Sequence, residues 1–204
     1  KQANYSLRGS ANASLGTSTT NTITLSKATL TVTGTTAPSK EYDGTTTIAT
    51  ISGGSLSGKL GSDTVTLTQA GAYSSADAGS GISITMNDSI SGTDAANYNL
   101  TQPTVTGTIS QKALGISATA TYSGSTTVTS PTATLTGLVS ADSSATVSSI
   151  VINDKDVADA TYITSLVLSN GKQANYSLRG SANASLGTST TNTITLSKAT
   201  LTVT

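Results

Sequence analysis

The sequence predicts an all-β protein, and three of its features support this prediction. Apolar and polar residues alternate in segments such as residues 64–68 and 82–86, and a period of two is the pattern of a strand with one buried face. Glycine, asparagine and aspartate clusters separate these segments at the short spacing of antiparallel hairpins. No window of roughly 12 residues has the period of a helix. The alternation also argues against disorder, although serine, threonine and glycine are abundant.

The chain contains an internal repeat. Residues 1–33 recur without a change at residues 172–204, so the sequence covers one period of 171 residues and begins the next. Within this period, Lys-Ala pairs begin at Lys27, Lys112 and Lys198, and the features between them follow the same order. We therefore predict four segments. They are residues 1–26 as the last strands of a preceding module, 27–111 and 112–197 as two diverged modules, and 198–204 as the first strand of the next module.

Alternation and turn residues together place the strands of the first module. We expect them near residues 28–33, 45–51, 63–68, 71–75, 81–86, 98–101 and 104–110. A module of about 85 residues is large enough for the single core of a small β-sandwich.

A local motif favours an immunoglobulin-like sandwich. Residues 94–98 have the spacing D-x-A-x-Y, in which a tyrosine hydroxyl bonds back to the backbone and fixes a loop before a late strand. We therefore expect Asp94 and Tyr98 to form such a corner, in small sandwich modules that follow one another end to end. Lys172 replaces the aspartate in the second module, and a β-grasp-like module is the alternative fold.

The composition excludes several functional classes. The chain has no cysteine and no histidine, so it lacks disulfides, thiolate metal sites and the usual general base. Its ten basic and ten acidic residues cancel and are scattered, which disfavours nucleic acid as a partner. No apolar stretch approaches the roughly 20 residues of a membrane helix, so we expect no membrane insertion in this segment. We also expect no enzymatic activity, no catalytic residue and no organic cofactor.

Three motifs resemble a known family. They are KEYDGTTT at residues 40–47, DAANYNLTQP at 94–103 and ISQKAL at 109–114. In combination they resemble the YDG repeat and the related MBG repeats of large secreted bacterial adhesins of the filamentous-haemagglutinin type. The second module resembles the same group more weakly, through residues 122–124 and 174–178. The resemblance implies an extracellular location on a bacterial cell surface and a place in a repeated stalk, and it brings no catalytic residue.

The motif residues have structural roles in this interpretation. Asp43-Gly44 is a tight-turn dipeptide, and a large aromatic ring such as that of Tyr42 can cap a core that lacks Phe and Trp. Tyr122 and Gly124 repeat this turn in the second module. Tyr98 and Tyr176 are expected to bind backbone through their hydroxyl groups.

Two other sites have weaker support. Asp154, Asp156 and Asp159 form the densest acidic stretch and could hold Ca²⁺ through carboxylate oxygens, but the stretch lacks the glycine and glutamate of a helix-loop-helix site and contains Lys155. An isopeptide bond would need a lysine, an asparagine and a carboxylate in an apolar interior, where lysines are rare.

The sequence therefore predicts a spacer repeat in the stalk of a bacterial surface adhesin. Its partners would be neighbouring repeats of the same chain, while other parts of the adhesin bind host or biofilm glycans. The alternative is a module that binds glycans or ice through threonine-rich strand faces, such as those at residues 29–33, 64–68 and 191–195.

Overall fold

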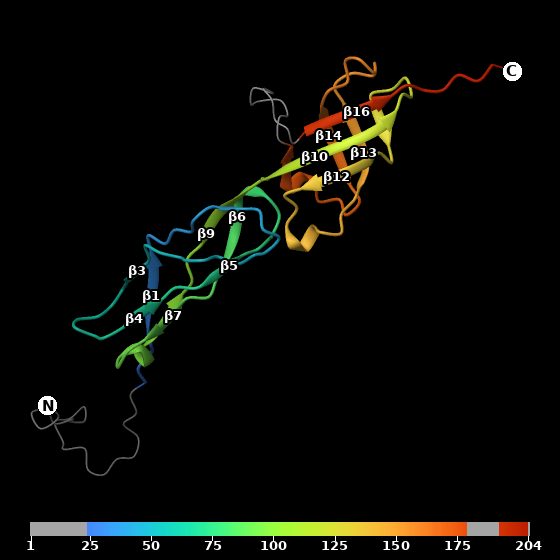
Figure 1. Cartoon of the computed structure of the whole chain (residues 1–204). Coiled ribbons are helices and arrows are strands. Elements are labelled where there is room, and N and C mark those ends of the chain that lie inside the picture. The colour runs from blue at the N-terminus through green and yellow to red at the C-terminus, as the bar shows by residue number, and fades with distance from the viewer. Residues whose placement is uncertain (1–23, 179–191, 204) are drawn as a thin grey trace, which may run out of the picture.

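The computed structural model describes residues 24–178 and 192–203, and in them the predicted all-β fold is confirmed. Strands and turns are joined there by three single-turn 3-10 helices, η2 (Ala95–Asn97), η3 (Ser140–Asp142) and η4 (Gln173–Asn175), and no α-helix is present (Figure 1). These residues contain no helix with the length and hydropathy of a membrane-spanning segment. The predicted strands within residues 1–23 lie outside the described part of the chain.

The first nine strands, which we call the N-terminal group, form three small sheets. The sheets have the orders β3-β1-β8, β2-β9-β6-β5 and β4-β7. The strands are β1 (Ala28–Thr33), β2 (Lys40–Glu41), β3 (Ser55–Ser57), β4 (Thr66–Thr68), β5 (Gly71–Tyr73), β6 (Gly79–Met86), β7 (Ser89–Ser91), β8 (Tyr98–Thr101) and β9 (Val105–Ser110).

The remaining strands, the C-terminal group, form two sheets. One has the order β12-β10-β15 with β16 also paired to β10, and the other has the order β11-β13-β14. The strands are β10 (Lys112–Thr121), β11 (Thr127–Thr129), β12 (Thr132–Thr136), β13 (Val147–Ile152), β14 (Ile163–Leu168), β15 (Tyr176–Leu178) and β16 (Asn192–Ser197).

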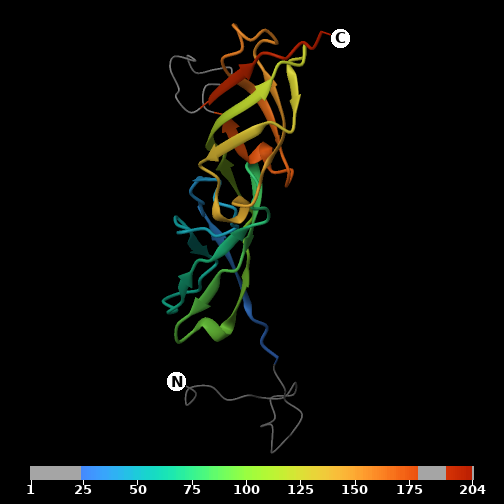
Figure 2. The same cartoon turned by 45° about the vertical axis from the view of Figure 1, so that its right-hand side comes forward.

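A single residue connects the two groups. Strand β9 ends at Ser110 and β10 begins at Lys112, so Gln111 alone separates them (Figure 1). One cluster of buried side chains extends through both groups, from Tyr73 and Ile109 to Leu114 and Leu196. The molecule is elongated along the direction in which the groups follow each other (Figure 2).

The strand expected at residues 45–51 is absent, and this prediction was wrong. Only Thr47 in this segment forms a β-bridge, with Ala72. The Lys40 ammonium binds the carbonyl groups of Thr45 and Thr47 at 2.6 and 3.2 Å, so these backbone groups have a side-chain partner in place of a regular strand ladder. Ile48 still packs against the core, which explains the alternation in the sequence.

The repeated sequence ATLTVT occurs in two different settings. As residues 28–33 it forms β1, which pairs with β3 and β8 and in which Leu30 is fully buried. In the second copy, at residues 199–204, the described residues form no strand and Leu201 is 92% exposed. Because the two sequences are identical, the strand depends on its partners β3 and β8 and not on local propensity alone.

Candidate functional site

The turn that contains Tyr42, Asp43 and Gly44 is held together by Lys40. The Lys40 ammonium forms an ion pair with Asp43 at 2.8 Å and binds the Thr45 carbonyl. The Asp43 carboxylate also accepts the Thr45 N–H at 2.8 Å, as aspartate commonly does in turns. The Lys40 ammonium lies 5.8 Å from the centre of the Tyr73 ring, within reach of a cation–π contact. These contacts define the conformation of the turn within the N-terminal group.

Gly44 lets this turn approach the C-terminal group closely. Its φ is +77°, a left-handed conformation that costs other residues energy. A Cβ atom at this position would lie 3.0 Å from the Ala141 Cβ and 3.4 Å from a Val139 methyl group. A side chain at residue 44 would thus be both strained and crowded.

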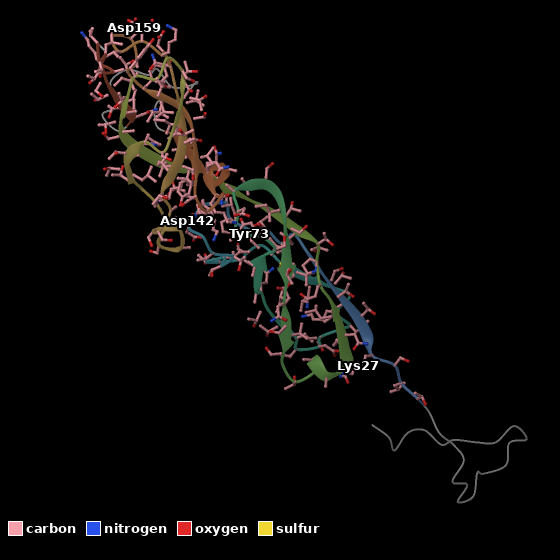
Figure 3. The ribbon with its side chains drawn as sticks, turned by 90° about the vertical axis from the view of Figure 1, so that its right-hand side faces the viewer. Lys27, Tyr73, Asp142 and Asp159 are labelled. Atoms are coloured by element: carbon pink, nitrogen blue, oxygen red, sulfur yellow. The ribbon has the colours of Figure 1, made fainter. Side chains whose placement is uncertain are left out.

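Tyr42 reaches across to the C-terminal group and binds Asp142. Its hydroxyl donates to Asp142 Oδ2 at 2.9 Å, and the Tyr176 hydroxyl donates to the same oxygen at 2.7 Å. The Asn170 amide donates to the other oxygen, Oδ1, at 2.9 Å. Asp142 is only 5% exposed and lies midway along the molecule (Figure 3). Three donors therefore satisfy a buried carboxylate at the contact between the two strand groups.

The surroundings keep both hydroxyl groups protonated. Burial, together with the hydrogen bond to Asp142, raises the pKa of Tyr42 to about 12. Burial and the same carboxylate also raise the pKa of Tyr176. The Tyr176 oxygen in turn accepts the Val139 N–H at 3.2 Å. At neutral pH both hydroxyl groups are hydrogen-bond donors, and the one on Tyr42 links the two strand groups.

Polar contacts surround this buried centre. Asp77 of the N-terminal group pairs with Lys172 and accepts the Asn175 amide, both at 2.8 Å. Asn175 also accepts the Ala78 N–H at 2.8 Å. Beside the connection, Lys112 pairs with Glu41 at 2.6 Å. We call the whole set of contacts, from Asp142 to these pairs, junction A.

The residue types of an isopeptide bond meet in junction A, but their charges do not suit the reaction. The hydrogen bonds from Lys172 and Asn175 lower the pKa of Asp77, and the hydrogen bond to Asp77 raises the pKa of Lys172. Both side chains are also about half exposed. The amine stays protonated and is a poor nucleophile, so these residues form an ion pair.

A match to a known family covers most of the N-terminal group. Residues 26–107 match the YDG domain family. The matched range contains the turn that supplies Tyr42 to junction A, and it ends within β9. The chain matches no curated protein and no solved structure.

At the other end of the segment that matches the YDG family, Tyr98 repeats the arrangement of Tyr176. Its hydroxyl donates to Asp63 at 2.6 Å and accepts the Leu60 N–H at 2.9 Å. The hydrogen bond to Asp63 raises the pKa of Tyr98. Asp94 holds the same loop by accepting the Thr64 N–H at 2.7 Å. A tyrosine, a carboxylate and a backbone N–H thus recur as a unit in both strand groups.

Tyr122 and Gly124 repeat the backbone of the YDG turn. The Tyr122 N–H donates to the Ser197 carbonyl at 2.8 Å, and the Tyr42 N–H donates to the Ser110 carbonyl at the same distance. Gly124 and Gly44 both have a φ of +77°. Tyr122, however, is 37% exposed, and it lies outside junction A.

The structure brings the three aspartates of the suggested calcium site together. Carboxylate oxygens of Asp154, Asp156 and Asp159 lie within 4.8 Å of one another, and oxygen ligands of this kind suit Ca²⁺. Lys155 pairs with Asp156 at 2.8 Å, and its positive charge competes with a cation. Asp159 lies at the end of the molecule opposite to Lys27 (Figure 3). Calcium binding stays a prediction.

Sequence reasoning did not predict the contacts of Asp142, Lys40 and Asp77. A weak signal for Asp142 is present, because an aspartate precedes the corner tyrosine by a similar number of residues in both halves, at Asp63 and at Asp142. Lys40 and Asp77 have no such signal, because their partners are set by the tertiary structure.

Proposed function

We propose that this chain is a spacer segment of a bacterial surface adhesin, made of β-sandwich modules stacked end to end at residues 27–111 and 112–197. The observation that carries the proposal is the buried hydrogen bond from Tyr42 to Asp142 across junction A. A flexible tether between independent domains would not bury a carboxylate at their contact. The connection of one residue, Gln111, also limits the range of hinge angles.

Bending at junction A would carry a large energetic cost. Moving Tyr42 away from Asp142 removes a hydrogen bond to a charged group, and leaving the Asp142 carboxylate buried without that donor adds a desolvation cost. The buried apolar cluster that runs through both strand groups would open as well. Resistance to bending is what a stalk needs in order to hold an adhesive region away from the cell.

The proposed cellular context is supported by the family match and by the sequence. The YDG match at residues 26–107 agrees with the resemblance to adhesin repeats, and the lack of cysteine suits a secreted chain that folds without disulfides. We place the protein outside the cell on a bacterial surface. Its partners are neighbouring repeats, and other parts of the adhesin supply contacts with glycans.

Small-angle scattering on chains with one, two and three periods of 171 residues tests the proposal. The expected result is a maximum dimension that grows by a constant length for each period and does not change with added glycans. A dimension that grows only as the square root of the number of periods would mean flexible linkage and would contradict a rigid spacer. The variant Asp142→Ala should lower the stiffness of the one-period chain.

A second candidate function, glycan or ice binding, is favoured by one surface. Strands β12, β10 and β16 place hydroxyl side chains next to one another on one exposed face, where Ser117 pairs with Thr134 and Thr193, and Thr119 pairs with Thr132 and Thr195. Rows of exposed threonine can order water or a polysaccharide chain. Ice recrystallisation and glycan-array binding, measured with wild type and Thr119→Lys, test this function. Equal results for both proteins would end it.

A further inference from the structure

We infer that the two ends of the 171-residue period are complementary, and that the Tyr122 end of one copy docks on the Asp63–Tyr98 end of the following copy. We call this contact junction B. The inference deepens the proposed function, because it rests on the tandem arrangement and assigns residues to the contact between successive periods. The partner is a second copy of this chain's own sequence.

The donating surface of junction B is the turn at Tyr122, and its backbone resembles that of the Tyr42 turn, which is the donating surface of junction A. Tyr122 and Gly124 match Tyr42 and Gly44 in the hydrogen bond to a strand-ending serine and in φ. Around Gly44 the C-terminal group fills the space, whereas the nearest atom to a Cβ on Gly124 is the Tyr122 hydroxyl at 3.9 Å. An apolar hollow lies beside Tyr122, lined by Tyr122, Val157, Lys198, Ala199 and Leu201. This end of the chain therefore has the form of a junction without its partner.

The accepting surface also has a counterpart in junction A. The unit of Tyr98, Asp63 and the Leu60 N–H reproduces Tyr176, Asp142 and the Val139 N–H. In junction A Val139 is 8% exposed, while Leu60 is 60% exposed. A hollow lies over this unit, lined by residues 25–28, Leu60, Asp63 and Ala96–Tyr98. In junction A, Tyr42 and its turn cover Val139 and Asp142. The counterparts of these residues in the N-terminal group, Leu60 and Asp63, are thus open.

The register of the connecting strand brings the two surfaces together. In junction A the residue two positions after Ser110 is Lys112, which lies opposite Tyr176 in the register of β10 and β15. In the first repeat the residue two positions after Ser26 is Ala28, which pairs with Tyr98. Ser26 recurs as Ser197 in the second copy, whose carbonyl accepts the Tyr122 N–H. The connection from Ser26 to its Lys-Ala pair is one residue shorter than the connection from Ser110, which includes Gln111. The tyrosine lies opposite the alanine of the pair in the first case and opposite the lysine in the second, so its spacing from the serine is the same.

This register has a direct geometric consequence. The Tyr42 N–H donates to the Ser110 carbonyl, and the Tyr122 N–H donates to the Ser197 carbonyl in the same way. Two residues after each serine, the strand residue lies opposite the tyrosine of the accepting surface, which is Tyr176 in junction A and Tyr98 in junction B. A following copy whose β3 and β8 pair with residues 199–204, as β3 and β8 pair with β1, must therefore place its own Tyr98 and Asp63 at Tyr122, because side chains two residues apart lie on the same face of a strand.

Junction B lacks the ion pairs of junction A. Thr121 stands in the place of Glu41, and Asp94 stands in the place of Lys172. Ala158-Asp159-Ala160 corresponds to Ala76-Asp77-Ala78, so Asp159 faces Asp94 where Asp77 pairs with Lys172. Two carboxylates repel each other. We therefore expect junction B to be weaker than junction A and to strengthen as salt screens this repulsion.

A disulfide formed across junction B tests the inference directly, because the chain has no cysteine of its own. Gly44 and Ala141 touch in junction A, and their counterparts in junction B are Gly124 of one copy and Ser62 of the next. The test chain is residues 1–204 followed by residues 34–204, which contains two periods. We expect Gly124→Cys in the first copy and Ser62→Cys in the second to form an intramolecular disulfide under mild oxidation.

Two further cysteine pairs calibrate this experiment. Gly44→Cys with Ala141→Cys should cross-link within one copy and gives the expected extent of reaction. Ser62→Cys in the first copy with Gly124→Cys in the second places the thiols at the two outer ends, and this pair should give no intramolecular product. Cross-linking of the junction B pair to within about twofold of the junction A pair is the result that we expect.

The outcomes separate this inference from the proposed function. An unreacted junction B pair, or one that gives only disulfide-linked dimers of chains, would overturn the inference. If scattering nevertheless shows a constant increase in length per period, the spacer function stands without junction B. If the length does not increase in that way, the spacer function fails as well.

Discussion

Tyr42 and Tyr176 meet edge to face above a single carboxylate oxygen, although they belong to different strand groups. Their ring centroids are 5.4 Å apart, and the ring planes make an angle of 81°. Both hydroxyl groups donate to Asp142 Oδ2. Edge-to-face aromatic pairs add stabilisation beyond the burial of their surfaces. One oxygen atom and two rings therefore combine hydrogen bonding, electrostatics and apolar packing at the centre of junction A.

Removing the Tyr42 hydroxyl should destabilise the protein. Tyr42→Phe keeps the ring contact but loses a hydrogen bond to a charged group, so we expect the free energy of unfolding to fall by about 1.5–3 kcal/mol. Urea denaturation of the full chain measures this change. Tyr122→Phe is the matched control, because Tyr122 is partly exposed outside junction A, and it should change the stability little. Equal effects of the two substitutions would contradict the role of the Asp142 contact.

Gly44→Ala and Gly124→Ala should differ although both glycines have a φ of +77°. The left-handed backbone costs each alanine about 1–2 kcal/mol. Only at residue 44 does the new methyl group also meet Ala141 and Val139, and such overpacking costs about a further 1–3 kcal/mol. Thermal denaturation of the two variants should therefore give the lower midpoint for Gly44→Ala. A lower midpoint for Gly124→Ala would show that the backbone strain, and not the contact, decides the outcome.

The extended segments were predictable because alternation reports which side chains are buried. The strands at residues 28–33 and 98–101 have the predicted bounds. The same pattern failed at residues 45–51, where side chains face the core but Lys40 takes the backbone carbonyl groups. Periodicity does not report where the backbone hydrogen bonds go, and this information comes from the tertiary structure.

The candidate site was predictable only in part. The tyrosines could be identified as large side chains in a core of small ones, but their partners could not be identified. Tyr42 and Asp142 are 100 residues apart in the sequence, and a single aspartate in a polar loop has no pattern that distinguishes it from a solvated one. The pairing of β10 with β15 and the loop that contains η3 bring Asp142 to Tyr42.

Alkaline pH should weaken junction A. The pKa of Tyr42 is raised from 10.0 to about 12, so its contribution to stability is complete below pH 10 and is lost as the pH rises toward 12. The stability of wild type should therefore fall with pH in this window. Tyr42→Phe has no hydroxyl to ionise at this position and should show a smaller fall. Denaturation midpoints between pH 9 and 12 measure the difference, and parallel profiles would show that Tyr42 does not carry it.

Acid should also weaken junction A, through the ion pair between Asp77 and Lys172 at its edge. The hydrogen bonds from Lys172 and Asn175 hold the pKa of Asp77 below its ordinary value of 3.8. A lowered pKa means that the contribution of Asp77 is present above the ordinary value and is lost as the pH falls below it. Asp77→Asn should therefore flatten the acid limb of the stability profile. Asp159→Asn is the control, because Asp159 is exposed at the far end of the molecule (Figure 3).

The measurement for this last pair of variants is the denaturation midpoint between pH 2 and 6. Asp77→Asn keeps a side chain of the same size but loses the charge that attracts Lys172, so the effect should shrink as salt is added. Asp159→Asn should leave the acid limb as in wild type, because no lysine binds its carboxylate among the residues that the structure describes. If Asp159→Asn flattens the profile as much as Asp77→Asn does, the acid dependence comes from general charge repulsion. In that case the ion pair with Lys172 is not a fixed part of junction A.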